Sequence, residues 1–171
     1  GPVAHRAGRR RRREPGPARA IIRNVPLPES GHRCGDLVLH DGARTGSRVV
    51  DGVEIPVFDE LALLQPSALG TFVVTVHGIT GPEAEDLVIR VAAAGLESED
   101  WTANKQSLCR ACSEGTIEHA HETADTVTTR TFGVAAKSAS AIREILEPRF
   151  ASLAGAAIET IECALPPLPV Q

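Results

Sequence analysis

The sequence predicts an α+β fold, specifically a ferredoxin-like (split βαβ) sandwich in which helices cover one face of a β-sheet. From Thr71 onward, segments with the alternating apolar pattern of strands are interspersed with segments that have the apolar spacing of helices. Their order is strand, helix, polar loop, strand, helix, strand, and one strand from the preceding region completes the sheet. Turn signals before Thr71 predict a β-hairpin N-terminal extension, and the polar loop is expected to be a zinc-ordered insertion.

Composition divides the chain into four parts. Its 171 residues, of which 42% are hydrophobic and only 3% aromatic, suffice for one domain with an aliphatic core. The parts are a disordered Arg-rich arm over residues 1–20, the β-hairpin extension over 21–70, the α+β core over 71–165 with a metal loop over 97–125, and a Pro-rich tail over 166–171.

The hairpin extension is predicted from a turn signal between two short apolar segments. Asp51-Gly52 suits the positive φ angles of a type I′ turn, so residues 49–55 are expected to form a tight hairpin. Residues 57–64 are expected to form a short helical turn, which Gln65-Pro66-Ser67 closes.

The first strand and helix of the core have the clearest pattern. Apolar residues alternate over positions 72–76, which is typical of a strand. Residues 80–86 form a helix start, because Pro82 suits the first helical position and the acidic residues that follow suit the positive end of the helix dipole. Gly95 is expected to end this helix. Its predicted buried stripe consists of Leu87, Val88, Val91 and Ala92.

A second unit of the same kind follows. Residues 126–136 predict a strand with a bulge near Gly133, because Val127 and Phe132 fall on opposite faces of a regular strand. Ser138 or Ser140 is expected to cap the next helix, which Pro148 ends or kinks. Residues 157–165 alternate again and predict the last strand. The apolar side of the second helix consists of Ile142, Ile145 and Leu146.

The strongest chemical signal is a cluster of metal-ligand types in the polar loop. Cys109 and Cys112 form a C-x2-C pair, and His119 and His121 follow closely. Zinc takes four such ligands in a tetrahedron, and a C-x2-C pair presents two thiolates from one turn. A polar loop as long as residues 97–125 is uncommon inside a compact domain unless something orders it. The sequence therefore predicts zinc as a structural cofactor.

Other uses of this cluster stay open. Both rings of the His-x-His pair reach one ion only if the backbone between them is extended. If it is not, three residues of the cluster bind the metal and Cys34 or another group supplies the fourth ligand. Thiol redox would place the cysteines at a helix N-terminus, and solvated side chains without metal are a further alternative. A catalytic zinc would need Glu118 or Glu122 as its base, but H-E-x-x-H is missing and the deaminase order is reversed. An enzyme is therefore the less favoured class.

Charge is distributed unevenly along the chain. Residues 1–23 carry eight arginines against one glutamate, a charge of +7. Because the net charge of the whole chain is −4, residues 24–171 carry a charge of −11. The arm is a candidate for attachment to nucleic acid, whereas the acidic body is not, because phosphate neutralisation supplies most of such affinity. The candidate contacts are Arg9, Arg10, Arg11, Arg12 and Arg13.

Trp101 is the single tryptophan and precedes the metal loop. It is a candidate partner-binding residue, because tryptophan is enriched where protein interfaces are energetically strongest. The alternative is that it packs beneath the loop as an apolar plug.

These observations predict a zinc-stabilised, non-catalytic binding module in the cytoplasm. Four cysteines are too few and too unevenly spaced for a secreted disulfide scaffold, and no apolar run approaches the ~20 residues of a membrane span. The expected partner is another protein or a second copy of the chain, and the basic arm adds possible attachment to nucleic acid. A small-ligand-sensing regulatory domain, with residues 77–81 as its binding turn, and a metal-dependent enzyme are the alternatives.

Overall fold

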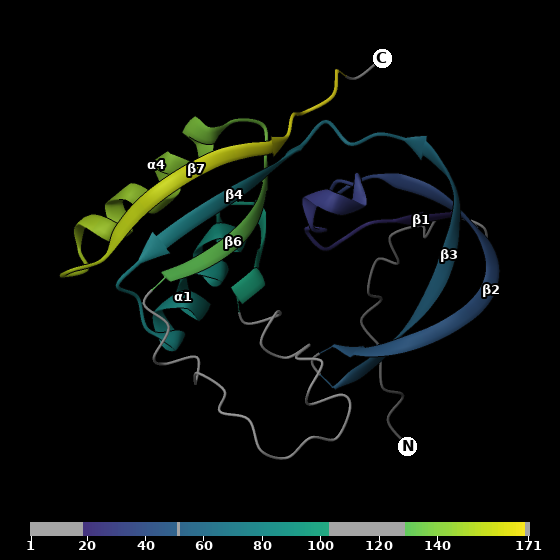
Figure 1. Ribbon diagram of the computed structural model, residues 1–171, viewed down its shortest axis with the longest axis horizontal. Helices are drawn as coiled ribbons and strands as arrows, with labels where there is room; N and C mark the ends of the chain where they lie inside the picture. Colours follow the sequence, from purple (N-terminus) through teal and green to yellow (C-terminus); the bar gives the residue numbers. More distant parts are fainter. Residues whose placement is uncertain (1–18, 51, 103–128, 170–171) are drawn as a thin grey trace, which may run out of the picture.

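The computed structural model describes residues 19–50, 52–102 and 129–169 of the chain. Within these residues the fold is mixed α+β, as the sequence predicts, with two β-sheets and two α-helices (Figure 1). None of the described helices has the length and apolar character that crossing a bilayer requires. The elements are β1 (Arg19–Ile21), the 3-10 helix η1 (Pro28–Ser30), β2 (Leu37–Val50), β3 (Val53–Gln65), β4 (Gly70–His77), α1 (Gly81–Ala93), β5 (Glu97–Asp100), β6 (Thr129–Ala136), α4 (Ala139–Ala151) and β7 (Ala157–Leu165).

The larger sheet has four antiparallel strands in the order β5-β6-β4-β7. β4 pairs with β6 on one side and with β7 on the other, so the first strand of this sheet along the chain lies inside it. α1 follows β4 and α4 follows β6, and both helices lie on the same face of the sheet (Figure 1).

The main core lies between this face and the two helices. Strand alternation turns every second side chain of β4 and β6 toward the helices, which confirms the expected buried positions at 72, 74 and 76. Ala92, which was expected in the buried stripe of α1, is instead exposed. Burial of each large apolar side chain in this core contributes on the order of 1.5–3 kcal/mol to the free energy of folding. The most deeply buried members include Phe72, Val74, Val76, Leu87, Val91, Phe132, Val134, Ile142 and Leu146.

Both helices begin where the sequence predicts, α1 within residues 80–86 and α4 after the expected cap Ser138. Thr80 and Glu83 form a capping box in which the Glu83 carboxylate accepts the Thr80 N–H at 2.7 Å and the Thr80 hydroxyl accepts the Glu83 N–H at 3.4 Å. Ser138 caps α4 by accepting the Ala141 N–H at 3.3 Å. Pro148 lies inside α4, which continues to Ala151, so the prediction that it could end the helix is wrong.

Two sequence predictions around β5 and β6 are also wrong. Residues 97–100, assigned to the metal loop, form the edge strand β5, which pairs with β6. The expected bulge near Gly133 is missing from residues 129–136, whose registers with β4 and β5 run without a shift. Gly133 has another role, because a Cβ atom there would overlap Cζ2 and Cε2 of Trp101. The glycine is needed for the indole to lie directly against the strand.

The smaller sheet has the order β1-β2-β3, and β2 and β3 form a long, strongly curved hairpin beside the larger sheet (Figure 1). The turn lies where predicted, with Val50 paired to Val53 and a positive φ of 75° at Gly52. The hairpin is much longer than expected, and the predicted helical turn over residues 57–64 is wrong because these residues continue β3.

A buried carboxylate joins the base of this hairpin to the rest of the chain. Asp36 is fully buried and accepts the Arg33 N–H at 2.8 Å and the Ser67 N–H at 2.7 Å. Ser67 follows β3, and Arg33 donates from Nε to the Pro166 carbonyl just after β7, at 3.0 Å. Together the side chains of Asp36 and Arg33 connect the start of β2, the end of β3 and the segment just after β7.

Candidate functional site

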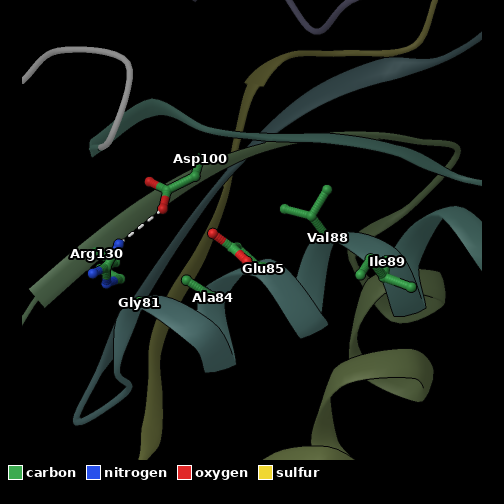
Figure 2. A pocket seen from close by; sticks show the side chains of 7 residues that line it. All are labelled: Gly81, Ala84, Glu85, Val88, Ile89, Asp100 and Arg130. Atoms are coloured by element: carbon green, nitrogen blue, oxygen red, sulfur yellow. Dashed lines mark hydrogen bonds and ion pairs between the residues drawn. The ribbon is translucent and has the colours of Figure 1, made fainter. Parts of the chain in front are cut away.

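A shallow hollow of about 430 Å³ lies between α1 and the edge of the larger sheet (Figure 2). The helix supplies an apolar wall from Ala84, Val88 and Ile89. The polar groups are Glu85 on the same helix, Asp100 at the end of β5 and Arg130 near the start of β6. A mostly apolar hollow with a few convergent polar groups is the usual form of a small-ligand site.

The polar end of the hollow is built around an ion pair. Arg130 follows the same alternation as Phe132, so its side chain turns toward the helix face and is only 2% exposed. Asp100 lies opposite Phe132 and therefore shares that face. Arg130 Nη1 lies 3.0 Å from Asp100 Oδ2, and Figure 2 shows the pair at one end of the hollow. A buried guanidinium is tolerated only with such a partner.

Backbone hydrogen bonds hold this ion pair in place. Asp100 Oδ1 accepts the Thr102 N–H at 2.9 Å, and the Thr102 hydroxyl accepts the Thr131 N–H at 2.8 Å. The chain leaving β5 is thus tied back to β6. The carboxylate of Asp100 is therefore fixed at the end of the hollow and oriented toward Arg130.

Acidic groups dominate the electrostatics here. Glu85 projects toward the ion pair in Figure 2, so two carboxylates and one guanidinium line the hollow. At the start of α1, hydrogen bonds from the Thr80 backbone and then its side chain hold the pKa of Glu83 below its ordinary value. The arrangement favours a ligand with a positive group and an apolar body over an anion.

The predicted zinc ligands lie outside the described residues. Cys109, Cys112, His119 and His121 all fall between residues 103 and 128, and Glu118 and Glu122 lie there too. Within the described ranges, no group of three or more His, Cys, Asp or Glu side chains has an arrangement suited to a metal ion. The zinc site therefore stays a prediction from the sequence. The arginines at positions 9–13 likewise lie outside the described residues.

Cys34, the suggested fourth ligand, is a buried thiol. It is 5% exposed, and its Sγ lies 3.6 Å from the Arg23 carbonyl. Burial, followed by the negative charge of Glu97, raises the pKa of this thiol to about 11. Since a metal binds the thiolate, this environment opposes ligation by Cys34 in the described arrangement.

Trp101 is 5% exposed and packs in a second apolar cluster. This cluster lies on the face of the larger sheet opposite the helices, where Val25 and Cys34 meet Ala135. The indole Nε1 donates to the Val25 carbonyl at 3.3 Å. These contacts bury the indole against residues of the same chain. The predicted role of Trp101 in partner binding stays untested.

No family model, curated protein or solved structure matches this chain. The Asp100–Arg130 pair carries no sequence signal, because the two residues are far apart along the chain and meet only through the pairing of β5 with β6.

Proposed function

We propose that this chain is a binding module that contacts a protein partner through its β2–β3 hairpin. Five of the eight large hydrophobic side chains exposed in the described residues lie on this hairpin. Val49 and Val53 beside the turn are 70% and 62% exposed, and Leu61 is 61% exposed. Isolated exposed apolar residues are normal, whereas their concentration on one projecting element is typical of an interaction surface. The five are Val49, Val53, Leu61, Leu63 and Leu64.

The charge of the hairpin indicates what the partner carries. β3 is an edge strand of the described three-stranded sheet, and Glu54, Pro56 and Glu60 lie along it. Proline and acidic residues on an edge oppose pairing with a second copy, because they remove a donor and place like charges together. Residues 37–65 carry two arginines against five acidic residues, a charge of −3. We therefore expect a different protein whose contact surface is apolar and bordered by basic side chains.

The remaining sequence predictions belong to the same proposal. The order β5-β6-β4-β7 with crossovers through α1 and α4 supports assignment of the larger sheet to the ferredoxin-like plan. The ligand types and spacing of Cys109, Cys112, His119 and His121 support a structural zinc. The Arg-rich arm supports an additional salt-sensitive attachment to nucleic acid, and the cysteine usage supports a cytoplasmic setting.

The hairpin proposal is tested with a photo-crosslinking residue at Leu63 in cells of the source organism. The partner captured by the crosslink is then purified. Its affinity for the wild type and for the double variant Leu61→Ser, Leu63→Ser is measured by calorimetry. We expect at least about a tenfold loss of affinity, equivalent to about 1.4 kcal/mol, because the variant removes apolar contact area. Leu27→Ser, which changes a leucine outside the hairpin that is 44% exposed, is the control, because Leu63 is 43% exposed. Equal affinity of the double variant and the wild type would exclude the hairpin as the contact surface.

The zinc proposal predicts about one zinc ion per chain in protein purified without chelator. Cys109→Ser and His121→Ala are each expected to lose that ion, because removal of a ligand opens the coordination sphere. Elemental analysis measures the metal content, and Cys163→Ser, which changes an exposed thiol of β7, is the control. A metal content near zero in the wild type would contradict the proposal.

A second candidate function is the sensing of a small ligand in the hollow beside α1. The observation that favours it is the fixed Asp100–Arg130 pair next to an apolar wall and Glu85. The expected ligand is a small organic cation with a short apolar body, which the acidic groups and the wall would hold together.

This function predicts that n-butylammonium raises the melting temperature more than butyrate at equal concentration, because a ligand bound to the native state stabilises it. Glu85→Gln is expected to abolish the difference, while Glu144→Gln on α4, another exposed acid, leaves it intact. Differential scanning calorimetry measures both effects. The same response to both ions in the wild type would rule out a cation-selective hollow.

A further inference from the structure

Thr129, His77 and Glu159 form a hydrogen-bonded row across β6, β4 and β7. The Thr129 Oγ1 lies 2.8 Å from His77 Nδ1, and His77 Nε2 lies 2.8 Å from Glu159 Oε2. The imidazole is 41% exposed and the carboxylate 50% exposed, so solutes reach both. None of the three lines the hollow beside α1.

The sheet register brings the three side chains together. His77 lies directly opposite Thr129 on β6 and opposite Ala157 on β7. The β4–β7 register shifts between Thr75 and Val76, and Glu159 is the extra residue of β7 at that shift. An irregularity of this kind turns a side chain away from its regular direction, and here it allows Glu159 to reach the imidazole.

Gly78 permits the close approach of the chain after β4 to the chain before β7. Gly78 has a φ of 69°, and a Cβ atom there would overlap the Gly155 carbonyl oxygen. Any larger residue at position 78 would push the end of β4 away from the start of β7. The row of polar groups therefore depends on a specific local backbone geometry.

Hydrogen-bond chemistry fixes the roles of the two ring nitrogens. An ionised carboxylate only accepts, so His77 Nε2 carries the proton that it donates to Glu159. In the neutral ring, Nδ1 is then the acceptor, and the Thr129 hydroxyl donates to it. A hydroxyl that donates to an imidazole oriented by a carboxylate is the arrangement that activates oxygen nucleophiles.

We propose that Thr129 is a nucleophile that accepts acyl groups from small carboxylic esters. Its oxygen forms a bond to the ester carbonyl carbon while its proton passes to His77 Nδ1. The bond from that carbon to the alcohol oxygen then breaks, and the leaving alcohol takes the proton from His77. The product is an O-acyl threonine, which water hydrolyses by the same steps. Glu159 is a positioning residue, and this activity is independent of the proposed binding function.

The test uses the full chain with p-nitrophenyl acetate, and p-nitrophenol release is followed together with peptide mass spectrometry. We expect acetyl groups on Thr129 and a release rate that falls about tenfold or more in His77→Gln and Thr129→Val, as loss of a general base or nucleophile requires. Thr129→Ser is expected to retain the reaction. Thr75→Val, which removes a threonine on the same face of β4, is the matched control.

A second measurement does not depend on turnover. The nitrogen NMR spectrum of His77 is expected to show the Nε2–H tautomer in the wild type and a mixture of tautomers in Glu159→Gln, because an amide both donates and accepts. Thermal melting verifies that each variant is folded. Acetylation confined to cysteine and lysine side chains, with an unchanged rate in His77→Gln, would overturn the proposal.

Discussion

Replacing Gly133 by alanine is expected to lower the free energy of unfolding by about 1–3 kcal/mol, the usual cost of overfilling a packed core. The added methyl group overlaps the indole of Trp101, which is held by its hydrogen bond to Val25. Neither the indole nor the strand moves freely, since Gly133 is also paired with Val73 and Glu99. Urea unfolding measures the loss of stability. The fluorescence maximum is expected to shift to longer wavelength as the indole is displaced from its apolar cluster, and the signal reports on this site because Trp101 is the only tryptophan.

A double-mutant cycle isolates the cause of this loss. In a Trp101→Leu background the clash is removed, so Gly133→Ala is expected to cost much less than in the wild type. Gly46→Ala in β2, where an added methyl group meets nothing within 4 Å, is the matched control. If Gly133→Ala cost the same in both backgrounds, contact with the indole would not be the reason for glycine at this position.

Replacing Asp36 by alanine is expected to cost more, about 2–5 kcal/mol. Its two oxygens accept the N–H groups of Arg33 and Ser67, and the alanine variant leaves both donors buried without that acceptor. Asp36→Asn is expected to cost nearly as much, because the amide nitrogen faces an N–H donor. Urea unfolding gives the free energies, and amide hydrogen exchange at positions 33 and 67 is expected to accelerate.

The control for Asp36 is Glu29→Gln in η1, which changes an exposed acid. A small effect of Asp36→Ala, close to that of this control, would mean that water replaces the carboxylate and that the joint at the hairpin base is weaker than the contacts indicate.

Local patterns in the sequence predicted much of the fold. The alternation over residues 72–76 and the Pro82 and acidic residues of the helix start are local properties, and β4 and α1 form where these properties place them. β7 spans the predicted residues 157–165 for the same reason. Residues 61–64 misled the prediction because Leu and Ala favour helices, yet pairing with β2 overrides that preference. β5 contains only polar residues, and its pairing with β6 alone makes it a strand.

The candidate sites were much harder to predict. Arg130 has no local pattern that announces its burial, and its partner Asp100 was assigned to a loop. His77, Thr129 and Glu159 belong to three strands and meet only through the sheet register and one irregularity in β7. The order of segments along the chain suggests the strand order of the sheet. It does not set the register between strands, and the register decides which side chains meet.

The central position of β4 has a consequence for synthesis of the chain. This strand emerges from the ribosome well before its partners, since β6 begins at Thr129 and β7 at Ala157. At roughly 5–20 residues per second, its apolar side chains wait several seconds for a partner strand. The hairpin of β2 and β3 has no such delay, because its strands are adjacent in sequence. The nascent chain therefore holds a folded hairpin beside an unpaired apolar strand, which is the state in which molecular chaperones are expected to bind it.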